Sequence, residues 1–104
     1  MTERTVRFTE DFFDRLEELL PAERGADGIP SITDFLAFEI PGLRDLLAAD
    51  AIGFTTATVI HGVRAYVNGG VLVPAILLYL AVDDHDVTVF DISLGREEPI
   101  ADLR

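Results

Sequence analysis

The sequence has no cysteine, no tryptophan and no lysine, and it holds only one methionine and two histidines. Without cysteine the chain can form neither a disulfide nor a thiolate zinc site, and it has no thiol nucleophile. Because lysine is absent, all eight basic residues are arginine. No basic segment precedes an apolar run at the N-terminus, so we expect no signal peptide and a cytoplasmic location.

The charge balance is strongly acidic, with 19 Asp and Glu residues and a net charge of −11. This charge repels nucleic-acid phosphates, whose binding rests on Lys and Arg contacts, and it repels anionic membrane surfaces as well. Direct nucleic-acid binding is therefore disfavoured, and a basic protein is the natural complement. The alternative explanation is a proteome-wide bias towards arginine and acid, because charge bears on solubility before it bears on function.

Length and hydrophobicity predict one globular unit. The chain has 104 residues, of which 49% are hydrophobic, so a packed core is possible and residues 1–104 are expected to form a single domain. The longest uncharged stretch, residues 65–82, is interrupted by Asn68, Gly69, Gly70 and Pro74. We interpret this stretch as a buried hairpin and expect no membrane span.

The first half of the chain has helical periodicity after one short strand. Residues 5–8 alternate and are β-prone, and Thr9 is placed to cap a helix that ends at Pro21. Ser31 and Asp34 resemble a capping box at the start of a second helix, in which Pro41 predicts a kink or a fresh start. The apolar faces of these helices are expected in the core, and they are formed by Phe12, Phe13, Leu16, Leu19, Leu20, Ile32, Phe35, Leu36, Ile40, Leu43, Leu46 and Leu47.

The second half has the period of strands. Residues 55–60 and 63–67 are expected to be strands joined by a tight turn at His61-Gly62, and Asn68-Gly69 is a hairpin signal. Residues 72–82 are almost wholly apolar, which predicts a central strand covered on both faces, with an irregularity at Pro74. Residues 83–86 form a polar turn, 87–93 the last strand, and a charged tail follows from Gly95.

This order of elements predicts an α+β fold. The expected architecture is an N-terminal strand, two helices of which the second is kinked or split at Pro41, and then a three- or four-stranded, mainly antiparallel meander. The helices should pack together on one face of the sheet.

Several short motifs, taken in order, resemble the RelE/ParE family of toxins from toxin–antitoxin modules. Residues 6–9, followed by Phe12 and Phe13, resemble the family's opening strand and helix. Residues 62–67 resemble its G-x-x-R strand, with the arginine one position early. Residues 77–79 and 83–89 resemble its closing hairpin, and residues 92–96 resemble its I-G-H-R ending without the histidine. The resemblance implies the α+β fold given above.

The resemblance also implies a toxin-type activity, for which the family offers two mechanisms. RelE-like members cut messenger RNA with a basic cluster, often with a C-terminal tyrosine, whereas ParE-like members poison DNA gyrase through protein contacts. This chain has no lysine and no tyrosine after Tyr79. Because RNA cleavage needs cations and a group that moves protons, protein binding without ribonuclease chemistry is the expected mechanism.

The candidate catalytic residues are Arg64, Arg96 and His61. The two arginines could engage an anion, and a histidine at a turn could act as a general base, although no recognised spacing ties it to a partner group. Each is more simply a surface residue. The acidic turn at 83–86 lacks the spacing of a cation site, so neither a metal nor a cofactor is expected. If the chain is an enzyme, it is a divergent ribonuclease, but we favour a protein that is not an enzyme.

Apolar residues exceed what one covered sheet face needs. Residues 87–92 place apolar side chains on both faces of the last strand. We therefore predict an exposed apolar patch for a protein partner, an antitoxin peptide or a second copy of the chain, with Phe12, Phe13, Phe90 and Ile92 as candidate contact residues. The alternative function is a non-catalytic acidic interaction module, antitoxin-like, immunity-like or mimicking nucleic acid, that binds a basic protein.

Overall fold

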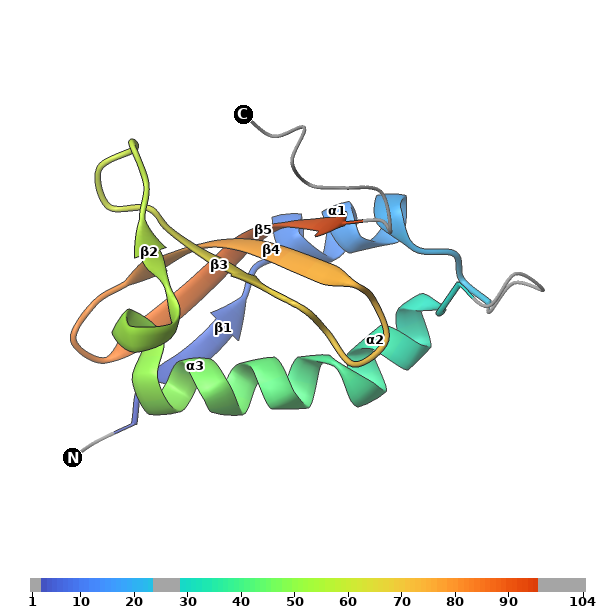
Figure 1. Ribbon diagram of the computed structural model, residues 1–104, viewed down its shortest axis with the longest axis horizontal. Coiled ribbons are helices and arrows are strands. Elements are labelled where there is room, and N and C mark those ends of the chain that lie inside the picture. The colour runs from blue at the N-terminus through green and yellow to red at the C-terminus, as the bar shows by residue number, and fades with distance from the viewer. Residues whose placement is uncertain (1–2, 24–28, 96–104) are drawn as a thin grey trace.

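The computed structural model describes residues 3–23 and 29–95. Along the chain these residues form strand β1 (Thr5–Phe8), helices α1 (Glu10–Leu19), α2 (Ile32–Phe38) and α3 (Ile40–Phe54), and then strands β2 (Thr56–Ala57), β3 (Arg64–Asn68), β4 (Ala75–Val82) and β5 (Asp86–Gly95). Figure 1 shows α2 and α3 running along one side of the sheet and α1 beside β5. The predicted α+β fold is therefore confirmed, with its helices before its hairpins.

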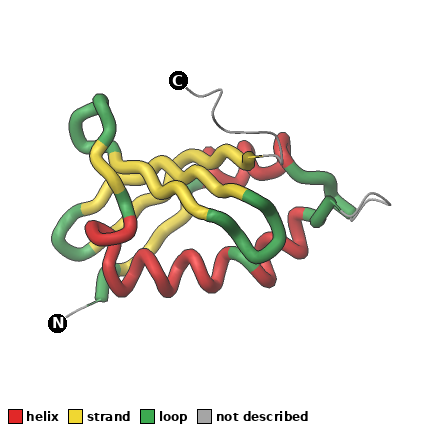
Figure 2. Tube along the Cα trace, viewed as in Figure 1, coloured by secondary structure: helices red, strands yellow, loops and turns green. Residues whose placement is uncertain are grey.

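The five strands form one mixed sheet in the order β1-β5-β4-β3-β2. Strands β2 to β5 are antiparallel to their neighbours, as the predicted meander requires. Strand β1 lies parallel to β5, with Val6 opposite Val87. The first strand of the chain thus joins the edge formed by the last one, and helices α1 to α3 make the connection between β1 and the meander (Figure 2).

The starts of α1 and α2 follow the predicted capping chemistry. The backbone N–H of Phe12 donates to Thr9 Oγ1 at 3.2 Å, and Ser31 and Asp34 form a reciprocal capping box at the start of α2. Helix α2 ends before Glu39, and α3 begins at Ile40 with Pro41 in its first turn, so the split at Pro41 is confirmed. A second break, at Asp50, was not predicted: its backbone leaves the helical region, and its carboxylate accepts the N–H of Gly53 at 2.9 Å.

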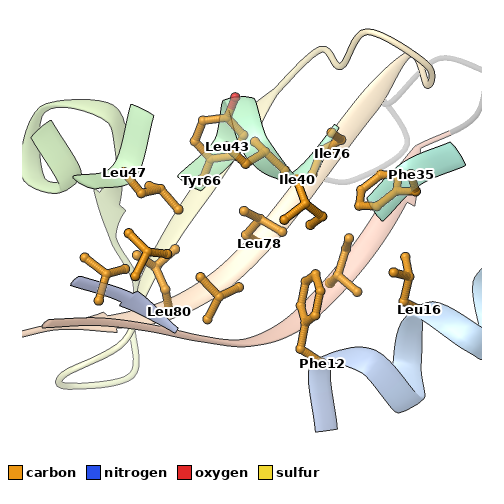
Figure 3. Packing of buried hydrophobic residues seen from close by; sticks show 14 of the residues in the cluster. Phe12, Leu16, Phe35, Ile40, Leu43, Leu47, Tyr66, Ile76, Leu78 and Leu80 are labelled. Atoms are coloured by element: carbon orange, nitrogen blue, oxygen red, sulfur yellow. The ribbon is translucent and has the colours of Figure 1, made fainter. Parts of the chain in front are cut away.

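The core lies between the helices and one face of the sheet. Its largest members come from every helix and from β3 to β5, and Figure 3 shows them pointing towards one another. Those labelled there are Phe12, Leu16, Phe35, Ile40, Leu43, Leu47, Tyr66, Ile76, Leu78 and Leu80. A single hydrophobic cluster joins both halves of the sequence. Among the helices of residues 3–23 and 29–95, none has the length and apolar character needed to cross a membrane.

Two predicted strands differ from those observed. The strand expected at 55–60 is reduced to Thr56–Ala57, because Thr58 turns the chain: its hydroxyl donates to the Val63 carbonyl at 2.9 Å and accepts the Ile60 N–H at 3.1 Å. The apolar run 72–82 becomes a strand only from Ala75, after Pro74. Strand β4 is the central strand of the sheet, as predicted, but its residues alternate between buried and half-buried, so only one of its faces is fully covered instead of both.

Candidate functional site

The acidic residues are distributed unevenly over the fold. No Asp or Glu occurs between Asp50 and Asp83, a segment that forms the last turn of α3 and all of β2, β3 and β4. The only arginine in this segment is Arg64, and its only histidine is His61. Strands β2, β3 and β4 are therefore free of acid in a molecule with a net charge of −11, so an anionic group of a ligand or partner meets the least repulsion there.

Arg64 joins β3 to the C-terminal end of α3. Its Nε donates to Thr55 Oγ1 at 2.7 Å, and its Nη2 donates to the carbonyls of Thr55 at 2.9 Å and Ile52 at 3.4 Å. The Thr55 hydroxyl in turn donates to the Ala51 carbonyl at 2.6 Å. A cation at this place satisfies carbonyls that the helix leaves unpaired and opposes the negative end of its dipole. Arg64 therefore has a structural role, which its position in the sequence did not reveal.

The loop after β2, residues 58–63, is held in one shape by its own hydrogen bonds. The Thr58 N–H donates to the Val63 carbonyl, and the Val63 N–H donates to the Ile60 carbonyl at 3.1 Å. This second bond closes a turn with His61-Gly62 at its centre, and Gly62 has a φ of 85°. A positive φ at the third position of a turn is the type II arrangement, which favours glycine. The predicted tight turn is confirmed.

A shallow pocket of about 300 Å³ lies between this loop, the end of α3 and the end of β4. It is lined by Ile52, Ala57, Thr58, Ile60, His61, Gly62, Val63, Arg64 and Val82. The fold thus brings His61 and Arg64, two of the three catalytic candidates, to one pocket, whereas Arg96 lies outside the described residues. Within residues 3–23 and 29–95 no carboxylate or serine lines the pocket, so His61 has no partner from these residues to form a catalytic pair.

The face of the sheet away from the helices is the second candidate surface, which we call the outer sheet face. Its side chains alternate with those of the core, and most are half-buried, although Val67 is 65% exposed. Its apolar members on β3 and β4 are Ala65, Val67, Leu77, Tyr79 and Ala81, and the half-buried Phe90 lies at the bulge of β5 next to Asp91, the partner of Tyr79. An apolar sheet face without a helix against it is the kind of surface that binds a partner.

Two of the predicted contact residues are wrong. Phe12 is fully buried on α1 beneath the sheet, and Ile92 is buried in the same core. The error at Ile92 comes from a β-bulge: Tyr79 pairs with Asp91 and Leu80 with Val89, so Phe90 is an extra residue. An extra residue reverses the alternation, and Ile92 therefore joins Val89 in the core. Phe90 is half-buried, and Phe13 is exposed on α1, so these two remain candidates.

The acidic turn between β4 and β5 is stabilised by the side chain of its first residue, Asp83. Asp83 Oδ1 accepts the backbone N–H groups of His85 at 2.8 Å and Asp86 at 2.7 Å, and these bonds lower the pKa of Asp83. Asp86 pairs with Arg7 at 3.3 Å. In the part of the chain that the structure describes, no three His, Asp or Glu side chains gather as a metal site would need.

Sequence reasoning missed the apolar side chains beside the pocket. Val59 is fully exposed at the tip of the loop, and Ile52 and Ile60 are each about half exposed or more. The signal was available, because the loop between β2 and β3 lacks the Asp, Asn and Ser residues that normally form turns. The β-branched residues Val59 and Ile60 instead favour a strand by sequence, which conceals their place in the loop.

Comparison with known proteins gives no relative: no protein-family model, no curated protein and no solved structure matches this chain.

Proposed function

We propose that this chain is a RelE/ParE-like, toxin-type protein that acts in the cytoplasm by binding another protein, without ribonuclease chemistry. The observation that carries the proposal is the outer sheet face, an apolar surface that no helix of the described residues covers. A partner segment laid across it would bury Leu77, Tyr79 and Phe90, the large side chains that remain half-buried in the chain alone.

The charge distribution supports binding without RNA cleavage. Cleavage of RNA needs cations around the reacting phosphate, but the acid-free half of the sheet holds one arginine, and three of its donor contacts go to α3. A protein partner needs only apolar contact and a few hydrogen bonds. The part of the outer sheet face that β3 and β4 form carries no acidic residue, although Asp91 of β5 lies opposite Tyr79, so a partner can reach that part without facing the acid of α1.

Expression in a bacterial host tests this proposal. We expect growth arrest on induction, relief of the arrest when the product of the adjacent gene is co-expressed, and intact messenger RNA in the arrested cells. Normal growth would contradict the toxin-type function. Arrest with messenger RNA cleavage that Arg64→Ala and Arg96→Ala abolish would contradict the claim that binding, not cleavage, causes it.

The second candidate function is an acidic interaction module for a basic protein, and helix α1 favours it. The exposed positions of α1 carry Glu10, Asp11, Asp14, Glu17 and Glu18. Its one arginine, Arg15, already pairs with Glu18 at 2.8 Å. Binding to this helix should weaken steeply as salt is raised, because exposed charges are screened within about 10 Å at 0.1 M salt. Binding to the outer sheet face should weaken far less.

A further inference from the structure

The loop 58–63 and the end of α3 present exposed aliphatic side chains around the pocket that holds His61 and Arg64. We call Ile52, Val59 and Ile60 the hairpin patch; Val59 is fully exposed and Ile60 is 62% exposed. Figure 1 shows the loop extending away from the sheet at the end of the molecule where α3 finishes. Large aliphatic side chains at a turn tip are costly in water, and they mark a binding surface when they occur together.

The hairpin patch is already ordered before any partner arrives. The Thr58 hydroxyl holds the loop by donating to the Val63 carbonyl and accepting the Ile60 N–H, and Arg64 holds the end of α3 by three hydrogen bonds. A surface that is fixed in advance loses little conformational entropy on binding. The order of the hairpin patch therefore favours a role in binding over that of a flexible connecting loop.

Two side chains that line the pocket, Arg64 and His61, keep polar groups without a hydrogen-bond partner in residues 3–23 and 29–95. Within this part of the chain, Arg64 uses Nε and Nη2 towards the end of α3 and leaves Nη1 unpaired, and the imidazole of His61 makes no hydrogen bond. Among the described residues no acidic side chain lines the pocket, and Val82 and Ile52 form its apolar wall. A guanidinium donor beside aliphatic groups fits one carboxylate that is itself flanked by apolar groups.

We propose that this pocket binds the carboxylate of an Asp or Glu side chain within an apolar segment of a protein partner. The carboxylate accepts from Arg64 Nη1 and His61, and its apolar neighbours pack on the hairpin patch. A polyanion does not fit, because the pocket offers a single spare arginine donor and the acids of the turn at 83–86 follow directly after Val82. This inference rests on the proposed function, because the pocket would form one of the contacts with the protein partner.

Titration of the ¹⁵N-labelled full chain with two peptides tests this site. The probes are the capped peptide acetyl-Ser-Leu-Val-Glu-Val-Leu-Ser-amide and the same peptide with Gln in place of Glu. We expect saturable amide shifts confined to residues 52–64 and 82, and binding about tenfold weaker for the Gln peptide, since one charge-assisted hydrogen bond is lost. Equal affinity for both peptides, shifts centred elsewhere, or no saturation would overturn the proposal.

Variants separate the two kinds of contact. Arg64→Gln should lower the affinity for the Glu peptide about tenfold and leave the affinity for the Gln peptide unchanged. This pattern indicates a direct pairing between Arg64 and the glutamate. Ile60→Ser should weaken both peptides equally, and it keeps the test valid if Arg64→Gln disturbs the end of α3. Val71→Ser is the matched control, because Val71 is 80% exposed but lies in the loop before β4, and it should change neither affinity. Loss of affinity in the control would count against the site.

This result and the growth experiment can fail separately. Peptide binding without growth arrest would leave the pocket standing and remove the toxin-type function. Growth arrest with no peptide binding would leave the toxin-type function standing and remove the pocket.

Discussion

Glu39 is the most buried carboxylate of the described residues, and it joins the α2–α3 junction to the loop before β4. It is only 5% exposed, and its two oxygens accept the backbone N–H groups of Val71 at 3.0 Å and Leu72 at 2.9 Å. Gly70 brings the chain close enough for these bonds, since a side chain there would collide with Glu39. The carboxylate thus satisfies two donors that the loop cannot pair by itself.

Removing this carboxylate should destabilise the fold. Glu39→Ala leaves two backbone donors unpaired and is expected to lower the free energy of unfolding by about 2–4 kcal/mol, whereas Glu39→Gln keeps one acceptor and should cost about 1–2 kcal/mol. Urea denaturation measures both. Glu17→Ala, on the exposed face of α1, is the control and should change stability by less than about 0.5 kcal/mol. A Glu39→Ala loss as small as that of the control would contradict this role.

Asp83 makes the stability depend on pH in the acid range. Backbone N–H groups of His85 and then Asp86 lower the pKa of Asp83 below its ordinary value of 3.8. The unfolded chain therefore takes up the proton first as the pH falls. The stabilisation is present above the unfolded pKa and is lost as the pH falls through the lower, folded one.

Asp83→Asn should reduce this dependence, because the amide oxygen still accepts hydrogen bonds but does not titrate. We expect the melting temperature of the variant to fall less than that of the wild type between about pH 4 and pH 2. Thermal unfolding followed by circular dichroism measures the slope. Asp84→Asn is the control, since the side chain of Asp84 accepts no hydrogen bond in the part of the chain described. Parallel curves for Asp83→Asn and the wild type would refute the linkage.

At the scale of elements, local chemistry in the sequence determined where helices begin. Thr9, Ser31 with Asp34, and Pro41 each lie where the helices start or split, because caps and proline act within a few residues. The strand faces were harder to predict. The bulge at Phe90 reverses the inward and outward positions, and nothing local in residues 87–93 distinguishes it from a regular strand.

Replacing either of two glycines by alanine should change the stability of the chain, but in opposite directions. Gly62 has a φ of 85°, so Gly62→Ala strains the turn and should destabilise the chain by about 1 kcal/mol, although no atom blocks the added methyl group. Gly42 lies inside α3 with open space around it, so Gly42→Ala should stabilise the chain by up to about 1 kcal/mol. Chemical denaturation compares the two variants. Changes of the same sign would contradict the assigned backbone conformations.

At the scale of the whole molecule, the acid lies on and beside the helices, near the termini, in the β4–β5 turn and on β5, while β2, β3 and β4 carry none. This separation could be read from the sequence, whereas the apolar surplus in residues 87–92 was assigned partly to the wrong face, because Ile92 is buried in the core. The pocket at the hairpin patch could not be predicted, because it depends on the break at Asp50 and on Thr58 turning the chain. Both are tertiary arrangements of residues that look ordinary in the sequence.

We propose that the outer sheet face binds a protein, and the side chains of this face can be changed without altering the core. Tyr79 is half-buried at the middle of this face, on the strand opposite Asp91. Tyr79→Arg places a charged side chain, within reach of Asp91, where the partner should pack, and burying that ion pair beneath a partner costs the desolvation of both charges. Leu36→Arg makes the same kind of change on the exposed side of α2 and is the control.

The most direct test is the growth rate of cells expressing each folded variant. We expect the wild type and Leu36→Arg to arrest growth, whereas Tyr79→Arg, expressed to the same level with an unchanged circular dichroism spectrum, should not. Arrest by Tyr79→Arg equal to that of the wild type would contradict this proposal.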